Sequence, residues 1–256
     1  ADLRPRLLSA LVMVAVGATE IWIGGPAFAA LVMVLTGVMA WELASITAAG
    51  PHHHALIVGF AAALSLLLIR MVPHPAIMLL LFAPSLLGLA LPRRDKVVFA
   101  AYALLIMLTG YGFITLRNGS GIEIILWLVL VVVASDILGY FAGRILGGPK
   151  FWPAVSPKKT WSGTVAGWIG AALVGLGFWA AGQGGAALIW LSPLVAFAGQ
   201  MGDIAESAIK RRAGVKDSSS LIPGHGGFLD RFDALAGAVV VVALLAHLMP
   251  LPIGGQ

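Results

Sequence analysis

The stretch from Glu123 to Leu146, EIILWLVLVVVASDILGYFAGRIL, decides the fold. It is long and apolar enough to form a helix across a bilayer, which needs about 20 apolar residues. One acid, Asp136, interrupts it, although a charge at the centre of such a helix costs about 2.5–3.5 kcal/mol or more. Acids inside membranes usually face a polar cavity or pathway. Asp136 is therefore a candidate site residue, and a buried ion pair with Arg144 is the alternative.

The composition extends this interpretation to the whole chain of 256 residues. Hydrophobic residues make up 60% of it and charged residues only 11%, whereas soluble domains carry about 25% charged residues. A soluble enzyme is therefore excluded. The chain has no cysteine, which excludes disulfides, thiolate metal sites and cysteine nucleophiles. Its net charge of +5 fits basic residues that flank membrane helices, so we expect no nucleic-acid partner.

Nine apolar stretches are predicted to cross the membrane. They are residues 7–23, 27–46, 56–72, 76–91, 97–115, 123–146, 164–181, 186–201 and 234–251. The prediction is an all-α polytopic membrane protein, a single integral membrane domain over residues 1–256, with two longer polar cytoplasmic loops. The alternative for the first stretch is a signal peptide, because "AFA" at 27–29 resembles a cleavage site.

The placement of basic residues predicts the orientation, because Lys and Arg concentrate on the cytoplasmic side. With the loops 147–163 and 202–233 inside, the N-terminus also lies inside and the C-terminus outside. Only Arg70 and Arg117 then lie outside, which leaves the other fourteen of sixteen basic residues inside. The three histidines at 52–54 also fall inside, where they are a weak candidate for a metal site.

Carboxylates gather in the second of these loops. Asp203, Glu206 and Lys210 share one helical face by their spacing, and Asp230 and Asp233 share another at the start of the last membrane helix. Mg²⁺ prefers oxygen ligands and is often held by one or two carboxylates plus substrate phosphates. Asp203, Asp230 and Asp233 are therefore candidate metal ligands. For Asp230 and Asp233 the alternative is stabilisation of a helix N-terminus.

Basic residues and hydroxyls in both loops suit phosphate groups. In the second loop the candidates are Lys210, Arg211, Lys216 and Arg231. The turn "PGHGG" at 223–227 allows backbone N–H groups to approach an anion. In the first loop, "SPKKT" offers Ser156, Lys158, Lys159 and Thr160 before a membrane helix, whose N-terminus suits a triphosphate. For the basic residues alone, anchoring at the cytoplasmic surface is the alternative.

One segment, SAIKRRAGVKDSSSLIPGHGGFLDRFD at Ser207–Asp233, resembles the signature of phosphatidate cytidylyltransferases, also called CDP-diacylglycerol synthases. The matching positions are Ser207, Lys210, Arg211, Lys216, Asp217, Ser219, Pro223, His225, Gly226, Gly227, Asp230, Arg231 and Asp233. The preceding segment from Ser135 to Gly163 is also similar to the family. It departs from the usual pattern at Leu138 and Gly139, and the resemblance is clear over residues 134–235.

The resemblance implies a reaction in which CTP and phosphatidate give CDP-diacylglycerol and pyrophosphate. It implies Mg²⁺ or Mn²⁺ as cofactor, and leaves open a monovalent cation and a homodimer. It also implies a site at the cytoplasmic face of the inner membrane, with residues 126–256 catalytic and residues 1–125 forming the lipid entrance.

The resemblance also implies roles for individual residues. Asp203, Asp230 and Asp233 would bind the metal, and Asp136 would support the cavity or a second cation. Phosphates would contact Lys210, Lys216, Arg231, Ser207 and Arg211. The CTP tail would contact Ser156, Lys158, Lys159 and Thr160. The turn of His225, Gly226 and Gly227 would lie against the nucleotide. The role of Glu42, near the inner end of the second stretch, stays open between an interfacial position and the site.

Three other functions fit the sequence less well. A CDP-alcohol phosphotransferase would carry a run of spaced Gly and Asp residues that the chain lacks. A CTP-dependent polyprenol or phytol kinase shares the nucleotide and a membrane site, but it would release CDP. A transporter or channel could line an ion path with Asp136 and Asp203, but it would have no use for "PGHGGFLDRFD".

Overall fold

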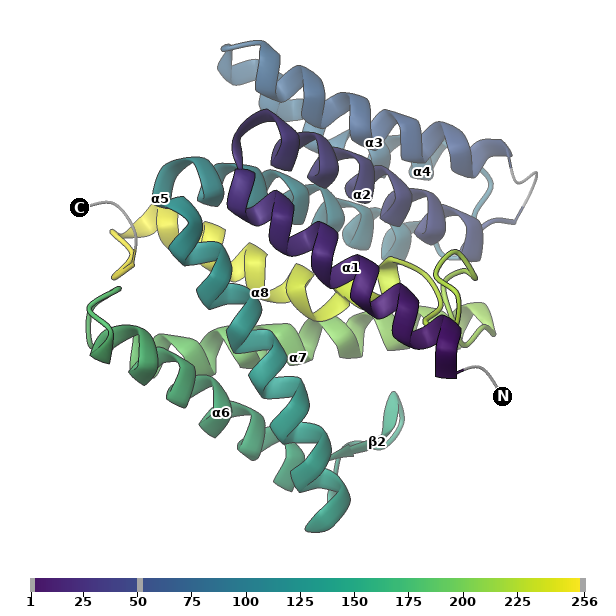
Figure 1. Cartoon of the computed structure of the whole chain (residues 1–256). Helices are drawn as coiled ribbons and strands as arrows, with labels where there is room; N and C mark the ends of the chain where they lie inside the picture. The colour runs from purple at the N-terminus through teal and green to yellow at the C-terminus, as the bar shows by residue number, and fades with distance from the viewer. Residues whose placement is uncertain (1–2, 50–52, 254–256) are drawn as a thin grey trace. The chain divides into compact units, whose positions relative to one another are not determined.

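The computed structural model describes residues 3–49 and 53–253, and nearly all of its regular structure is helical. The helices are α1 (Leu3–Ile23), α2 (Gly25–Ile46), α3 (His53–Met71), the 3-10 helix η1 (Pro75–Phe82), α4 (Ala83–Ala90), α5 (Lys96–Ile145), α6 (Trp161–Ala180), α7 (Leu188–Ala213) and α8 (Leu229–Leu248) (Figure 1). Strands β1 (Lys150–Trp152) and β2 (Ser156–Thr160) form an antiparallel hairpin. The predicted all-α class is confirmed.

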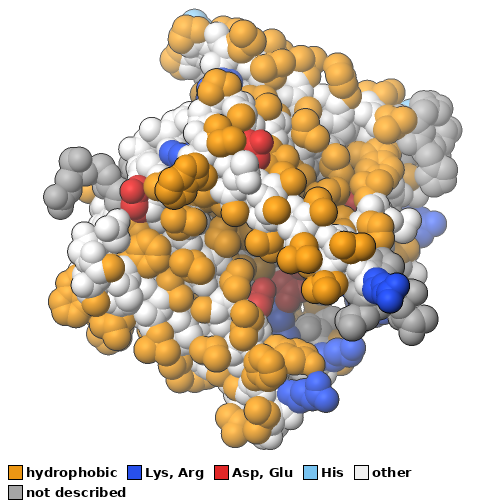
Figure 2. All heavy atoms as spheres, viewed as in Figure 1, with side chains coloured by type: hydrophobic (Ala, Val, Ile, Leu, Met, Phe, Trp, Pro, Cys, Tyr) orange, Lys and Arg blue, Asp and Glu red, His pale blue; other side chains and the backbone are white. Residues whose placement is uncertain are grey.

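In the described part of the chain, seven helices are long and apolar enough to cross a membrane. Apolar side chains are spread over the whole of the face drawn in Figure 2, as expected for a surface that lies in lipid. Two predicted stretches are merged in α5, which has 50 residues and breaks at Gly121, where φ is 81°; glycine adopts such angles without steric cost. The apolar segment Pro75–Ala90 is shorter than the helices that can cross a membrane. The protein is a multi-pass membrane protein, but the count of nine is not confirmed.

The chain divides into two compact units, and the prediction of a single domain stays a prediction. The first unit comprises residues 1–114 and 209–232, and the second comprises residues 115–208 and 233–256. In the first unit α2 and α3 pack side by side (Figure 1). They meet at Gly37 and Gly59, where a Cβ atom on Gly59 would lie 2.7 Å from the carbonyl oxygen of Gly37. Small residues allow membrane helices to approach this closely.

A buried arginine fixes the loop before α5 in the first unit. Arg93 donates to the carbonyl oxygen of Ala44 (2.5 Å) and to Oγ1 of Thr47 (3.2 Å). Its guanidinium lies 4.1 Å from the centroid of the Phe99 ring, a cation–π contact. Burial lowers the pKa of Arg93 from its usual value. These contacts attach the loop to the C-terminal end of α2.

In the second unit, glycines again mark the places where helices touch. A Cβ on Gly163 of α6 would lie 2.6 Å from the carbonyl oxygen of Gly139 in α5. A Cβ on Gly202 of α7 would overlap the carbonyl oxygen of Asp233 in α8. Larger residues at these positions would therefore force the helices apart. The contact at Gly202 brings the backbone of Asp233 against the residue before Asp203.

Candidate active site

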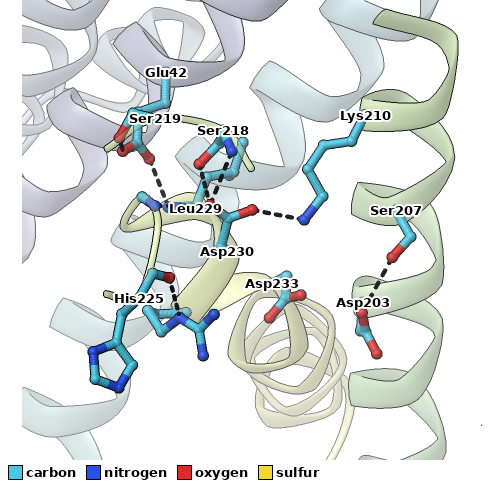
Figure 3. Close-up of polar contacts among 12 residues, drawn as sticks. Glu42, Asp203, Ser207, Lys210, Ser218, Ser219, His225, Leu229, Asp230 and Asp233 are labelled. Carbon is cyan, nitrogen blue, oxygen red and sulfur yellow. Dashed lines mark hydrogen bonds and ion pairs between the residues drawn. The ribbon is translucent and has the colours of Figure 1, made fainter. Parts of the chain in front are cut away.

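Three carboxylates meet in the second unit, between α7 and α8. Asp203 and Glu206 come from α7 and Asp233 from α8, and one oxygen atom of each lies within 4.8 Å of the others. Figure 3 shows Asp203 and Asp233 reaching from their two helices. Glu206 is almost fully buried and the other two are half-buried. Within residues 3–49 and 53–253 this is the one group of three or more side chains placed to hold a metal ion.

A lysine from the hairpin lies beside this acidic cluster, by which we mean Asp203, Glu206 and Asp233. The Nζ atom of Lys159, in β2, lies 2.5 Å from Oδ2 of Asp203. Ser207, one turn further along α7, lies 3.4 Å from Oδ1 of the same carboxylate. Lys159 and Asp203 both remain partly exposed. The cluster therefore combines hard-cation ligands with a positive charge, which suits a metal ion and a phosphate together.

The other predicted residues of the hairpin differ in their surroundings. Thr160 is buried and caps α6, because its Oγ1 accepts the N–H of Gly163 at 3.2 Å. Ser156 is half-buried in β2, and Lys158 is exposed. The structure brings Lys159 to the acidic cluster and gives Thr160 a structural role. Their contact with CTP stays a prediction.

In the first unit, the loop between α7 and α8, which carries most of the family signature and is called the signature loop below, folds around Asp230. Its Oδ2 accepts hydrogen bonds from the N–H (2.9 Å) and Oγ (2.8 Å) of Ser218 and from the N–H of Gly227 (2.7 Å). Its Oδ1 accepts from Nζ of Lys210 at 2.6 Å (Figure 3). The carboxylate is buried, and a buried charge is stable when it is paired and hydrogen-bonded in this way. Asp230 therefore orders the loop and holds Lys210.

A second carboxylate, Glu42 of α2, holds the same loop from another side. Its Oε1 accepts from Oγ of Ser219 (2.6 Å) and the N–H of Phe228 (3.0 Å), and its Oε2 accepts from the N–H of Leu229 (2.6 Å). Glu42 is fully buried. It faces the loop, and its depth relative to the membrane interface stays a prediction.

The turn at 222–226 is held by α1. Nδ1 of His225 lies 2.8 Å from Oγ of Ser9, which also donates to the carbonyl oxygen of Pro223 (3.1 Å). Nε of Arg231 donates to the carbonyl oxygen of His225 (3.1 Å). At Gly226 φ is +85°, and a Cβ there would lie 2.8 Å from Oδ2 of Asp230. Glycine at this position lets the turn lie against the carboxylate.

Several predicted residues are exposed. Arg211, Lys216 and Asp136 on α5 are among them, and Asp136 is not a member of the acidic cluster. Arg231 is also exposed, and its Nε donates to the loop at His225. The predicted histidine site at 52–54 includes His52, which lies outside the described residues. The roles of these residues stay predictions.

Comparisons with known proteins identify relatives over the whole chain. A family model described as "Cytidylyltransferase family" matches residues 4–249. A phosphatidate cytidylyltransferase of Brucella abortus is 31% identical over 258 residues, which cover 98% of this chain and 96% of the relative. Proteins with the same name from Helicobacter pylori and Staphylococcus saprophyticus are 41% identical over 145 residues and 38% identical over 160. These two matches cover 54% and 60% of this chain, and 54% and 61% of the relatives. The resemblance drawn from the Ser207–Asp233 signature is confirmed.

Proposed function

Because the chain belongs to the cytidylyltransferase family, we propose that it transfers CMP from CTP to phosphatidate and releases pyrophosphate. The observation that carries this proposal is the acidic cluster with Lys159 beside it, in a chain whose relatives are phosphatidate cytidylyltransferases. An oxygen of the lipid phosphate bonds to the α-phosphorus of CTP, and the bond from that phosphorus to the bridging oxygen of the β-phosphate breaks. The lipid phosphate is already anionic near neutral pH, so the reaction needs no strong general base.

Asp203, Glu206 and Asp233 would hold a divalent cation such as Mg²⁺ or Mn²⁺. Their oxygens lie within 4.8 Å of one another, and carboxylate oxygens are the ligands that these ions prefer. When bound, the cation offsets the repulsion between the two anionic substrates and the charge of the leaving pyrophosphate. Asp230 and Asp136 were also predicted as ligands. Asp230 is the weaker candidate, because both of its oxygens already accept hydrogen bonds from the protein.

The protein's own cations would bind the phosphate oxygens. Lys159 stands at the acidic cluster, and Lys210 is oriented by Asp230. Fixed charges of this kind stabilise the developing negative charge on the leaving group, because they need no rearrangement when it forms. Lys158, Arg211, Lys216 and Arg231 are exposed, so they would attract CTP and contact its outer phosphates.

The substrates also set the location that we propose. CTP is dissolved in the cytoplasm and phosphatidate is confined to a leaflet, so the reaction takes place at the inner boundary of the cytoplasmic membrane. The basic residues of both polar loops favour the same side. We therefore place the N-terminus inside and the C-terminus outside.

A labelling experiment tests the reaction directly. The purified protein is incubated in mixed micelles with phosphatidate and with CTP labelled at either the α- or the γ-phosphate. The α-label is expected in the lipid product and the γ-label in pyrophosphate. Transfer of the γ-label to lipid, with release of CDP, would show a kinase and overturn the proposal. Ion flux without any nucleotide turnover would favour a transporter instead.

A further inference from the structure

Glu42 is a buried acid near the end of a membrane helix, and the proposed chemistry gives it no task. Its side chain is 0% exposed, so it has no surface with which to touch CTP or lipid. Burial of a carboxylate is unfavourable unless hydrogen bonds compensate. The function of Glu42 must therefore be sought in its three donors.

All three donors belong to the signature loop or to the start of α8. Ser219, Phe228 and Leu229 lie 177, 186 and 187 residues further along the chain. The first N–H groups of a helix have no partner within the helix, and a negative charge is favourable there. The N–H of Leu229, the first residue of α8, is one of these groups. Helix α8 thus takes its N-terminal cap from α2, through a contact between distant parts of the chain.

The carboxylate also lies directly against the backbone of Gly227. A Cβ atom at Gly227 would overlap Oε1 of Glu42 and Oγ of Ser218. The N–H of the same glycine donates to Asp230, whose other oxygen holds Nζ of Lys210 at 2.6 Å. Two carboxylates, Glu42 and Asp230, therefore hold one short backbone segment from both sides. Displacement of that segment would displace the Asp230–Lys210 pair.

We propose that Glu42 is a positioning residue for the nucleotide: it fixes the backbone of residues 227–229 and thereby the Asp230–Lys210 pair, whose lysine contacts the CTP phosphates. This inference rests on the proposed function, which assigns Lys210 to the phosphates. Glu42 acts through the loop and touches neither substrate. It should therefore affect the use of CTP and leave the use of phosphatidate almost unchanged.

The substitution Glu42→Gln tests this role, with Glu20→Gln as the matched control. Glu20 is also a glutamate of an apolar helix in the first unit, and it lies in α1. Gln keeps the shape of the side chain but loses its charge and turns one acceptor into a donor. We expect KM for CTP to rise about tenfold or more in Glu42→Gln. KM for phosphatidate should stay within about twofold of wild type, and Glu20→Gln should match wild type in both.

Each variant is assayed well below its own melting temperature, so that unfolding does not contribute. A lower melting temperature with an unchanged KM for CTP would show that Glu42 is only structural, and would overturn the inference. If Glu42→Gln does not fold, Ser219→Ala replaces it, because this variant removes a single donor to Glu42. Ser219→Ala should lower kcat/KM for CTP about threefold or more, and an unchanged value overturns the inference.

The double variant Glu42→Gln/Ser219→Ala shows whether the two residues act through their contact. If they do, its loss in kcat/KM for CTP is smaller than the product of the two single losses. Losses that multiply fully would mean independent effects and would contradict the role of the contact.

Hydrogen exchange separates this inference from the proposed function. If wild-type protein releases no pyrophosphate, the proposed function fails, but the positioning of the loop can still be measured. Peptides from residues 217–232 should exchange faster in Glu42→Gln than in wild type and in Glu20→Gln. Equal exchange in all three proteins overturns the inference, whatever the activity.

Discussion

At the scale of single residues, the surroundings of each carboxylate decide what it can do. Asp230 is surrounded by hydrogen-bond donors of the protein, including two backbone N–H groups and Lys210. Asp203, Glu206 and Asp233 instead lie within 4.8 Å of one another. Like charges this close repel one another, and a bound cation relieves the repulsion. The first arrangement stabilises a loop, and the second suits an ion.

Glu206→Gln tests the acidic cluster. The change removes one charged oxygen ligand and keeps the size of the side chain. We expect kcat/KM to fall about 100-fold or more, and the Mg²⁺ concentration for half-maximal rate to rise. Initial rates over a Mg²⁺ series measure both effects. Glu123→Gln, another glutamate of the second unit, is the control and should behave as wild type; an unchanged Mg²⁺ dependence in Glu206→Gln would exclude this residue as a ligand.

Asp230→Asn tests the role of Asp230 in the loop. The new amide group would face Lys210 or Ser218, so at least one buried donor would lose its acceptor, at a cost of about 1–3 kcal/mol. We expect a lower melting temperature and at least about a tenfold loss of turnover. Asp95→Asn removes an acid that pairs with Arg212 at the surface, and it should change turnover less than twofold. Turnover of Asp230→Asn within a few-fold of wild type would contradict the assigned role.

Some of these site residues can be predicted from the sequence, and others cannot. Asp203 and Asp233 were predicted because carboxylates at a helix boundary in an apolar chain are conspicuous. The spacing of Glu206 predicts that it shares a helical face with Asp203, but it lies outside the family signature, which gives no sign that it is a ligand. The function of Glu42 could not be predicted, because its partners lie more than 170 residues away in sequence and no local pattern connects them.

At the scale of elements, the length of the apolar stretches predicts most of the long helices, but it gives no sign of the short strands. The break at Gly121, where the backbone is not helical, agrees with the two stretches predicted on either side of it. The hairpin β1–β2 was predicted only as a polar loop, because strands of three and five residues are too short to show a period. That hairpin brings Lys159 to Asp203. Because the hairpin is not predicted from the sequence, the contact between Lys159 and Asp203 is not predicted either.

Gly202→Ala tests whether the close approach of α7 and α8 supports the acidic cluster. The new methyl group would overlap the carbonyl oxygen of Asp233, and overpacking of this kind costs about 1–3 kcal/mol. We expect a lower melting temperature and reduced activity. The control is Gly177→Ala in α6, where a Cβ would meet nothing within 4 Å, and melting curves with initial rates for both variants provide the comparison. Equal behaviour of the two variants would contradict a structural role for Gly202.

At the scale of the whole molecule, composition alone predicted the class. A chain with 60% hydrophobic and 11% charged residues folds into apolar helices that can cross a membrane. The orientation depends on the distribution of sixteen basic residues, and the fold does not determine it. It is therefore a property to be measured on cells.

Introduced cysteines can report the orientation, because the chain has none of its own. Gln183 and Ser220 are both exposed and lie in loops that the orientation places on opposite sides. In intact spheroplasts, a membrane-impermeant maleimide should label Gln183→Cys and not Ser220→Cys. Permeabilised cells should show labelling of both. The reverse pattern in intact spheroplasts would place the signature loop outside, where CTP is absent.

The central claim is that this protein joins CTP to phosphatidate with the help of a divalent cation. The most direct measurement is pyrophosphate release by the purified wild-type protein, with CTP, phosphatidate or Mg²⁺ left out in turn. Release should require all three, and one CDP-diacylglycerol should form for each pyrophosphate. Pyrophosphate that forms at an equal rate without phosphatidate or without Mg²⁺, or CDP in place of pyrophosphate, would contradict the claim.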